Sequence, residues 1–277
     1  MTFPLSMTFP FPRPASAEPI STEPGTIDDG YMDSFQVGKH RHHPSVSVVI
    51  PALNEAENLP HVLPRIPAWV DEVLLVDGNS SDGTPEVARR VLDRVRIVQQ
   101  KGPGKGAALQ TGFAVATGDI IVAMDADCST NPAEIPLFCA ALLSGADYVK
   151  GSRFLQGAGS DDMEFVRLFG NWAFAIGVRV LFRANYTDVT YGYNAFWRRV
   201  LPRLELDGDG FEIETLMCLR ALRAGLRVVE IPSFEVRRKY GSSRLHALPD
   251  GWRVLKTILK ERIMRRSSRP QAGFVTP

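Results

Sequence analysis

Two aspartates that stand one residue apart, Asp125 and Asp127, follow the apolar run 119–124. If that run is a β-strand, both carboxylates lie at the edge of a sheet, where open α/β sheets bind their ligands. Two such carboxylates can share one hard divalent cation, which usually keeps some water and binds the phosphates of a substrate. An Asx-rich turn that closes a strand is the alternative. The spacing alone leaves a metal site and a turn as competing interpretations.

Polar residues also end two earlier apolar runs. Asn54 and Glu55 follow the run 46–50. Glu55 and the exposed backbone could receive the base and ribose of a nucleotide, as edge turns do in nucleotide-binding sheets. The alternative is that Asn54 simply caps the next helix. Asp77 ends the run 72–77 and could accept a hydrogen bond from a base or a ribose. We therefore assign Asp77 to a ligand.

A glycine-rich segment, 102–106, lies at the start of a predicted helix. Backbone N–H groups at a helix start attract anions, and Lys105 adds a compact positive charge that suits a diphosphate. The segment lacks the spacing and the Ser or Thr of the nucleoside-triphosphatase phosphate loop. By itself it does not identify a phosphate site.

The elements that would position these residues alternate between strand and helix. β-Branched runs, each followed by a polar turn and a helical segment, are typical of a parallel sheet in an α/β fold. Strands are expected at 46–50, 72–77, 95–98 and 119–125, and helices at 86–92, 105–116 and 134–143.

Beyond Gly151 the alternation stops. This second half is expected to cover the sheet and to form the other wall of a cleft. The pattern there predicts a helix at 165–183, a strand and turn at 187–197, a helix at 211–224, and paired strands around Val228 and Val236.

Composition excludes some classes of protein. The 277 residues carry 32 Lys and Arg against 31 Asp and Glu, so no overall field attracts nucleic acid and we expect none as a partner. The hydrophobic fraction of 44% suffices for a packed core. Three widely spaced cysteines favour reduced thiols in a cytoplasmic protein. Residues 1–44 are rich in Pro, Ser and acidic residues and predict a disordered leader.

Six motifs occur in one order between residues 46 and 245. They are PALNE at 51–55, DGNSSDGT at 77–84, GKG at 104–106, DAD at 125–127, GSR at 151–153 and RKYGSSRL at 238–245. In this order they resemble the inverting family 2 glycosyltransferases with the GT-A fold, in particular the branch of polyprenyl- or dolichyl-phosphate mannosyl- and glucosyltransferases. The resemblance implies a Rossmann-like α/β fold, with a mostly parallel sheet flanked by helices, and a hexosyltransferase.

The resemblance also implies roles for single residues. Asp125 and Asp127 would bind Mg²⁺ or Mn²⁺ beside the diphosphate, and Arg153 would face the acceptor or the diphosphate. The late arginines would close over phosphates. The implied donor-binding residues are Pro51, Ala52, Asn54, Glu55, Asp77, Asn79, Lys105, Asp125, Ala126, Ser129, Arg238 and Arg244.

Two positions depart from the family's pattern. Many relatives carry Gln two residues after the second aspartate, where this chain has Ser129. A metal contact there is expected to be shorter or to run through water. The last motif usually ends in Ser-Lys-Leu, whereas Arg244 replaces the lysine's point charge by a planar fork. Phosphate binding is compatible with both changes.

The acceptor decides whether a general base is needed. A metal ion and nearby basic side chains would neutralise the leaving nucleoside diphosphate. A hydroxyl acceptor must lose a proton, whereas a lipid phosphate is already an anionic nucleophile at neutral pH. If a base exists, the candidates are Glu212 and Glu214, which point in different directions on a helix. We favour Glu214; the alternative is that both acids only stabilise a helix start.

Two segments have the pattern of helices at a lipid interface. In 165–183, polar residues at multiples of four leave an apolar surface; a core helix with a solvated stripe is the alternative. In 247–277, an apolar face opposes basic residues that would attract an anionic leaflet. No stretch reaches the length of a membrane span, so we expect peripheral contact at the inner membrane face.

These patterns lead to one main hypothesis. It is a metal-dependent, inverting transfer of a hexose from a nucleotide-diphosphate sugar, of the GDP-mannose or UDP-glucose type, to a polyprenyl phosphate. The same donor chemistry on a soluble hydroxyl acceptor is the alternative, and a non-catalytic nucleotide-sugar-binding protein is a remote one. The predicted organisation is a leader at 1–44, a GT-A domain at 45–246, and an amphipathic basic helix with a flexible tail at 247–277.

Overall fold

The computed structural model describes residues 43–161, 165–242 and 246–265. The described residues from Pro44 onward form one compact unit, which includes the helix expected after residue 246. The predicted leader lies outside the described residues up to residue 42, and Arg244 also lies outside them.

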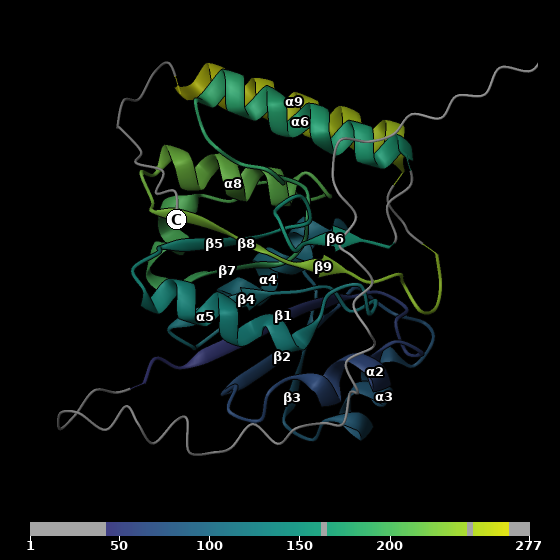
Figure 1. The fold of residues 1–277 in the computed structure, drawn as a ribbon. Coiled ribbons are helices and arrows are strands. Elements are labelled where there is room, and N and C mark those ends of the chain that lie inside the picture. The colour runs from purple at the N-terminus through teal and green to yellow at the C-terminus, as the bar shows by residue number, and fades with distance from the viewer. Residues whose placement is uncertain (1–42, 162–164, 243–245, 266–277) are drawn as a thin grey trace, which may run out of the picture. The chain divides into compact units, whose positions relative to one another are not determined.

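A seven-stranded sheet runs through this unit (Figure 1) in the order β3-β2-β1-β4-β7-β5-β8. All neighbouring pairs are parallel except those of β7, which is antiparallel to both β4 and β5. The predicted α/β fold with a mostly parallel sheet is confirmed. The strands are β1 (Val46–Ala52), β2 (Glu72–Asp77), β3 (Val95–Gln99), β4 (Ile120–Ala123), β5 (Tyr148–Ser152), β7 (Asn194–Trp197) and β8 (Val228–Pro232).

Helices cover both faces of the sheet (Figure 1). Val49 and Val76 belong to the core on the side of α4 and α8, whereas Val48 and Leu75 belong to the core on the side of α2, α3 and α5. Successive side chains of a strand point to opposite faces, so a fully apolar strand is one that is buried on both sides. The helices are α2 (Leu59–Val62), α3 (Thr84–Val91), α4 (Gly104–Val115), α5 (Ile135–Leu143), α7 (Leu201–Leu204) and α8 (Ile213–Arg223), with 3-10 turns at Leu63–Arg65, Pro132–Glu134 and Arg198–Val200.

The strands expected to pair around Val228 and Val236 do not pair with each other. β8 lies beside β5 in the main sheet, whereas β9 (Phe234–Glu235) pairs with β6 (Gly159–Ser160) in a separate two-stranded sheet. Only Ser233 separates β8 from β9. Common hairpin turns need at least two loop residues, so these strands pair with earlier segments instead.

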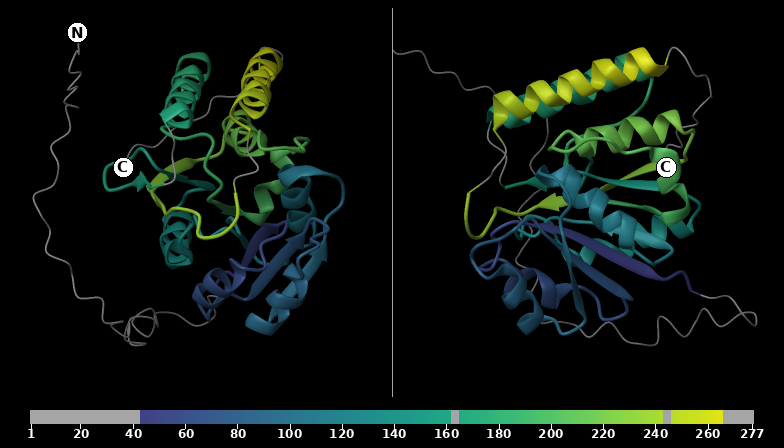
Figure 2. Two further views of the ribbon diagram at one scale, coloured as in Figure 1. Left: turned by 90° about the vertical axis from the view of Figure 1, so that its right-hand side faces the viewer. Right: turned by 180° about the vertical axis from the view of Figure 1, so that it is seen from behind.

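Two long helices, α6 (Phe165–Phe182) and α9 (Ala247–Arg265), lie side by side, and α9 also packs on α8 (Figure 2). Val178 and Phe182 of α6, and Val254 and Ile258 of α9, are buried in the core. Each helix therefore has a core face and also an exposed apolar surface. The exposed apolar residues are Leu168, Phe169, Trp172 and Val180 on α6, and Leu248, Trp252, Leu255, Leu259, Ile263 and Met264 on α9.

The sequence left open whether α6 is a core helix or a helix with an apolar surface for lipid. The structure shows a buried side on α6 and also exposed apolar side chains. Within the described part of the chain, no helix combines the length and the apolar character that crossing a membrane requires.

A buried ion pair joins α8 to α9. Arg220 Nε donates to Glu261 Oε1 at 2.8 Å, and Arg223 Nη1 donates to Glu261 Oε2 at 3.1 Å. Without Glu261, Arg220 keeps only its pair with the half-exposed Asp207 and its hydrogen bonds to backbone carbonyls, and Arg223 keeps its pair with the exposed Glu205. Glu261→Ala is therefore expected to lower the free energy of unfolding by about 1.5–3 kcal/mol, the cost of losing hydrogen bonds to a charged group. Lys260→Ala, which breaks an exposed pair with Asp207, should cost about 0–1 kcal/mol. Urea denaturation measures both, and equal small losses would contradict the prediction.

Candidate functional site

A cavity of about 900 Å³ lies at the carboxyl ends of β1 and β4. Pro51 and Ala52 of β1 line it, the residues Asp125–Asp127 after β4 line it, and Asn79 from the turn after β2 joins them. The structure therefore brings the paired carboxylates to a cavity rather than to a solvent-exposed turn.

Each of these carboxylates meets a basic side chain from a distant segment. Lys105 Nζ lies 2.6 Å from Asp125 Oδ1, and Arg238 Nη2 donates to Asp127 Oδ2. The N–H of Ser129 donates to Asp127 Oδ1 at 3.0 Å. Ser129 thus positions the second carboxylate through its backbone.

Lys105 bridges two carboxylates within the cavity. Its Nζ lies 2.7 Å from Glu214 Oε1 as well as close to Asp125. Burial favours the neutral amine, but the two carboxylates outweigh burial and raise the pKa of Lys105. The ammonium therefore remains a fixed positive charge at neutral pH.

Two backbone N–H groups in the first turn of α4 are already occupied. The N–H groups of Gly106 and Ala107 donate to the carbonyl oxygen of Asp209, at 2.8 and 3.2 Å. The two segments approach so closely that a Cβ on Gly106 would lie 2.1 Å from the carbonyl oxygen of Gly208. The glycines therefore serve this contact, and the Lys105 side chain is the part of the motif that offers positive charge to the cavity.

Of the two acids at the start of α8, Glu214 lines the cavity and Glu212 does not. Glu214 is 1% exposed. Burial raises the pKa of Glu214, Lys105 opposes that shift, and Asp125 adds to it. Glu212 instead accepts a hydrogen bond from the N–H of Gly210.

The loop after β9 brings Arg238 to the first turn. Arg238 Nη1 lies 3.4 Å from Glu55 Oε1, although 183 residues separate them. Asn58 Nδ2 donates to Glu55 Oε2 at 2.6 Å and to the carbonyl oxygen of Tyr240 at 3.3 Å. Burial raises the pKa of Glu55. These contacts join the first and last described motifs around one site.

Two expected donor residues, Asn54 and Asp77, do not line the cavity. Asn54 has a φ of 56° and accepts a hydrogen bond from the N–H of Ser81 at 2.8 Å. Asp77 is buried and accepts from the N–H of Ser80 at 3.3 Å. Their side chains organise the turns after β1 and β2, and the nucleoside contacts predicted for them stay predictions. The helix cap considered for Asn54 is not formed, because α2 begins after Asn58. The expected donor residues on the cavity wall are Pro51, Ala52, Glu55, Asn79, Lys105, Asp125, Ala126, Ser129 and Arg238.

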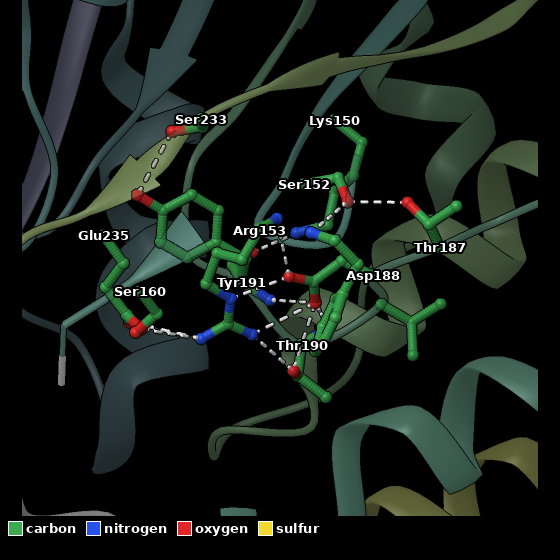
Figure 3. A network of polar contacts seen from close by, with 12 residues as sticks. Lys150, Ser152, Arg153, Ser160, Thr187, Asp188, Thr190, Tyr191, Ser233 and Glu235 are labelled. Carbon is green, nitrogen blue, oxygen red and sulfur yellow. Dashed lines mark hydrogen bonds and ion pairs between the residues drawn. The ribbon is translucent and has the colours of Figure 1, made fainter. Parts of the chain in front are cut away.

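Arg153 also lines the cavity, but its guanidinium is bound within the protein (Figure 3). Nε and Nη2 donate to the two carboxylate oxygens of Asp188 at 2.7 and 3.1 Å, and Nη1 donates to Glu235 at 3.2 Å. Nη2 also donates to Thr190 Oγ1 at 2.9 Å, and the guanidinium lies 4.7 Å from the Tyr191 ring centroid. Arg153 thus braces three segments of the cavity wall, and its contact with an acceptor or a diphosphate stays a prediction.

Sequence reasoning missed the residues that hold Arg153. Asp188 stands between Thr187 and Val189, and Glu235 between Phe234 and Val236. Nothing in this local pattern shows that both acids are buried and therefore need a partner. Gly192 had no local signal either. Its backbone passes so close to the first aspartate that a Cβ would lie 2.4 Å from Asp125 Oδ2 and 2.9 Å from Lys105 Nζ.

Comparison with known proteins decides the family. Residues 47–204, more than half of the chain, match the model described as "Glycosyl transferase family 2". The chain belongs to this family. The resemblance of its motifs is thereby confirmed, and the protein is a glycosyltransferase.

Two named relatives of this glycosyltransferase come from bacteria. It is 36% identical to the undecaprenyl-phosphate mannosyltransferase of Micrococcus luteus, over 72% of this chain and 87% of that protein. It is 33% identical to the polyprenol monophosphomannose synthase of Mycolicibacterium smegmatis, over 72% of this chain and 80% of that protein.

Solved structures confirm the GT-A fold. Glucosyl-3-phosphoglycerate synthase from Mycobacterium tuberculosis, solved with Mn²⁺, uridine diphosphate and glucosyl-3-phosphoglycerate, has a TM-score of 0.63 and is 25% identical. The similarity covers 79% of this chain and 80% of that chain.

The approach of Gly192 to Asp125 makes Gly192→Ala a test of site geometry. The added methyl group must displace the Asp125 carboxylate or the Lys105 ammonium. Both are ends of flexible side chains, so the fold should tolerate the change, while glycosyl transfer falls roughly a hundredfold, as expected for a misplaced active-site group. Gly177→Ala, in helix α6 with nothing within 4 Å of its Cβ position, is the control. Steady-state rates and urea unfolding distinguish the two effects; unchanged activity in Gly192→Ala would contradict the prediction.

Proposed function

We propose that this glycosyltransferase moves a hexose from a nucleotide-diphosphate sugar, of the GDP-mannose or UDP-glucose type, to a polyprenyl phosphate, with inversion. The similarity to the undecaprenyl-phosphate mannosyltransferase of Micrococcus luteus carries this proposal. The cavity supports it, because paired carboxylates lie there beside two basic side chains, Lys105 and Arg238.

Asp125 and Asp127 fit a hard divalent cation, Mg²⁺ or Mn²⁺. They offer carboxylate oxygens to one cavity, and oxygen is the ligand atom that these cations prefer. Among residues 43–161, 165–242 and 246–265, no three acidic, His or Cys side chains form a metal cluster. Donor phosphates and water would therefore complete the ligand set, and the bound ion would act as a Lewis acid on the diphosphate.

The protein's own residues supply further stabilisation of the leaving group. Lys105 is held protonated and in place by Asp125 and Glu214, so it presents a preorganised positive charge. Arg238, at the end of a loop, contacts Asp127 and Glu55. A guanidinium there is suited to bind phosphate oxygens through its planar fork.

A polyprenyl phosphate acceptor needs no general base, because its phosphate is an anion at neutral pH. In this reaction an acceptor phosphate oxygen forms the new bond to the anomeric carbon, and the nucleoside diphosphate leaves with the electron pair of the broken bond. The role of Glu214 would then be to hold the Lys105 ammonium in place, and it would take no proton from the acceptor.

A soluble hydroxyl acceptor is the second candidate, and Glu214 is the observation that favours it. Its Oε2 has no hydrogen-bond partner among the described residues and its pKa is raised by burial, which suits a general base. The neighbour from Mycobacterium tuberculosis is named for a phosphoglycerate product. The remote alternative of a non-catalytic nucleotide-sugar-binding protein has no support among the named relatives.

Peripheral contact with an anionic membrane, at the inner face, belongs to the same proposal. The exposed apolar surface of α6 and α9 supports it, with basic residues such as Lys256 and Lys260 on the same α9 helix. Nucleic acid is not expected as a partner, because the net charge is only +1.

The test is the release of nucleoside diphosphate from a panel of GDP- and UDP-sugars, with Mn²⁺ or Mg²⁺, with and without a short polyprenyl phosphate. Acceptor-dependent release with one donor is the expected result. Donor binding without lipid-dependent release would refute the polyprenyl acceptor and favour the soluble one, with Glu214→Gln as the next variant.

A further inference from the structure

The cavity that holds the paired carboxylates continues between α6 and α9. Its lining includes Phe169, Gly170 and Phe174 from α6, and Leu248, Gly251 and Val254 from α9. Apart from Asp250, which accepts a hydrogen bond from the N–H of His246 at 2.8 Å, the α9 part of this lining is apolar or glycine. On the α6 side, Arg167 and Asn171 line the cavity as well. One cavity thus has a charged end at the aspartates and an end between two helices where apolar and glycine residues outnumber the polar ones.

Glycines inside these helices are not explained by packing within the chain. Glycine in a helix interior costs about 1 kcal/mol relative to alanine, and close approach of a neighbouring segment is a common reason to keep it. A Cβ on Gly170 would meet no atom within 4 Å, and one on Gly251 would meet only Phe174 Cζ at 3.7 Å. Both positions therefore leave open space on the wall of the cavity.

The outer faces of the same helices carry exposed aromatic and aliphatic side chains. Phe169 and Leu248 both line the cavity and are 61% and 84% exposed. Trp172, with its ring centroid 5.9 Å from that of Phe169, and Trp252 are also exposed. An occupant that enters the apolar end thus passes residues suited to a lipid surface.

Polar atoms at the other end of the cavity lack partners. Among the described residues, the buried Glu214 Oε2 and the buried Arg238 Nε have no hydrogen bond, and both residues line the cavity. Buried polar groups are normally satisfied. These atoms indicate that a polar ligand completes this end of the same cavity.

We infer that the groove between α6 and α9, lined by Gly170 and Gly251, binds the hydrocarbon chain of a lipid phosphate whose phosphate lies toward the paired aspartates. This inference rests on the proposed function and deepens it, because it assigns a chain-binding site to the acceptor. A molecule with a charged head and a long apolar chain matches both ends of the cavity. The glycines provide the width that a methyl-branched chain needs.

The test compares two acceptors, geranyl phosphate and undecaprenyl phosphate, in wild type, Gly170→Leu and Gly251→Leu. The leucine side chains occupy the groove, so kcat/KM for the long acceptor relative to the short one is expected to fall about tenfold, the effect of losing the burial of roughly two methylene groups. Gly177→Leu is the matched control, because Gly177 is also in α6 with open space but does not line the cavity. Its ratio should remain that of wild type.

The outcomes separate the inference from the function on which it rests. Transfer to both acceptors with an unchanged ratio in Gly170→Leu and Gly251→Leu would overturn the groove and leave the function standing. No transfer to either acceptor by wild type would refute the function, and the groove with it. A third outcome is that wild type self-associates, that both variants lose this self-association, and that the ratio of kcat/KM values for the two acceptors does not change. The groove would then be occupied by a second copy of the protein, and the inference would be overturned.

Folding of the variants is checked by thermal denaturation. If either leucine variant fails to fold, Gly170→Ala and Gly251→Ala take its place, since alanine favours a helix over glycine. A smaller loss in the same ratio is then expected, and no change in the ratio would overturn the inference.

Discussion

Asp127→Ala is expected to reduce hexose transfer about a thousandfold, which corresponds to roughly 4 kcal/mol of transition-state stabilisation. The carboxylate of Asp127 lies in the cavity, where the N–H of Ser129 and the guanidinium of Arg238 orient it. In the proposed function it holds half of the metal site, and a Lewis-acid cation supplies several kcal/mol to a departing phosphate. The measurement is acceptor-dependent release of nucleoside diphosphate, together with Mn²⁺ binding by electron paramagnetic resonance.

Asp127→Asn and Glu57→Ala are the matched variants for this prediction. Asparagine keeps the shape of the side chain and removes its charge, so it should lose nearly as much activity as alanine. Glu57 is an exposed acid that does not line the cavity, and its loss should leave the rate close to that of wild type. If Asp127→Ala still turns over the donor at the normal rate, the metal role of this residue is wrong.

Arg153→Met is expected to have the largest effect on stability. It removes the guanidinium from between Asp188 and Glu235, whose side chains are 0% and 8% exposed. Two buried carboxylates are then left without their cation. Breaking a buried pair in this way costs about 3–5 kcal/mol, measured as the change in the free energy of unfolding. Arg199→Met, which removes an exposed arginine, is the control and should cost about 0–1 kcal/mol.

The pH dependence of this loss follows from the pKa of Asp188. Burial raises that pKa, but Arg153 outweighs burial and holds it at about 2, below the value of about 3.9 for an unfolded chain. The contribution is therefore complete above pH ~4 and disappears as the pH falls toward ~2. In Arg153→Met, burial of Asp188 is no longer opposed by the guanidinium and raises its pKa, so the variant binds this proton at a higher pH than wild type does. The difference in unfolding free energy between wild type and Arg153→Met should therefore begin to shrink above pH ~4 and continue to shrink toward pH ~2. A difference that does not change with pH would contradict the assignment.

Activity of Arg153→Met addresses a separate question. If Arg153 only braces the wall of the cavity, Arg153→Lys should recover part of the transfer activity, because lysine restores the positive charge between Asp188 and Glu235. A residue that binds phosphate through two parallel N–H donors should not be rescued by lysine, because an ammonium cannot reproduce the planar fork. If Arg153→Met folds and keeps full activity, the predicted contact with phosphate is wrong.

Much of the architecture was readable from the chain alone. The runs at 46–50, 72–77 and 119–124 are apolar on both faces, and such runs indicate strands buried within a parallel sheet. Their polar ends therefore had to meet at one edge, and this reasoning alone places Asp125 and Asp127 at a site. The order of the motifs added the family, because several short patterns in one sequence order are far more specific than any single one.

The tertiary structure decided which side chains at that edge face the cavity. Asn54 and Asp77 stand in the predicted turns but do not line the cavity: Asn54 accepts a hydrogen bond from the neighbouring turn, and Asp77 accepts one within its own turn. Arg153 stands in a recognised motif, yet its guanidinium is held by Asp188 and Glu235 from later segments. Residue type and spacing describe what a side chain can do, whereas its partner depends on which distant segments lie within about 3 Å of it.

The same distinction applies to the helices and to the last strands. The periodicity of α6 and α9 indicated apolar faces. Only the tertiary structure showed that the two helices lie side by side and that a glycine from each helix lines the cavity. A strand at Val228 was predictable from the sequence, but the predicted strand near Val236 is only Phe234–Glu235 and ends one residue before it. The pairing of Val228 with Tyr148, and the hydrogen bond from the N–H of Val236 to the carbonyl oxygen of Ser129, depend on segments far away in the chain. A sequence determines local preference and burial through short-range periodicity. Contacts between segments far apart are decided only when the whole chain folds, because each depends on the positions of all the others.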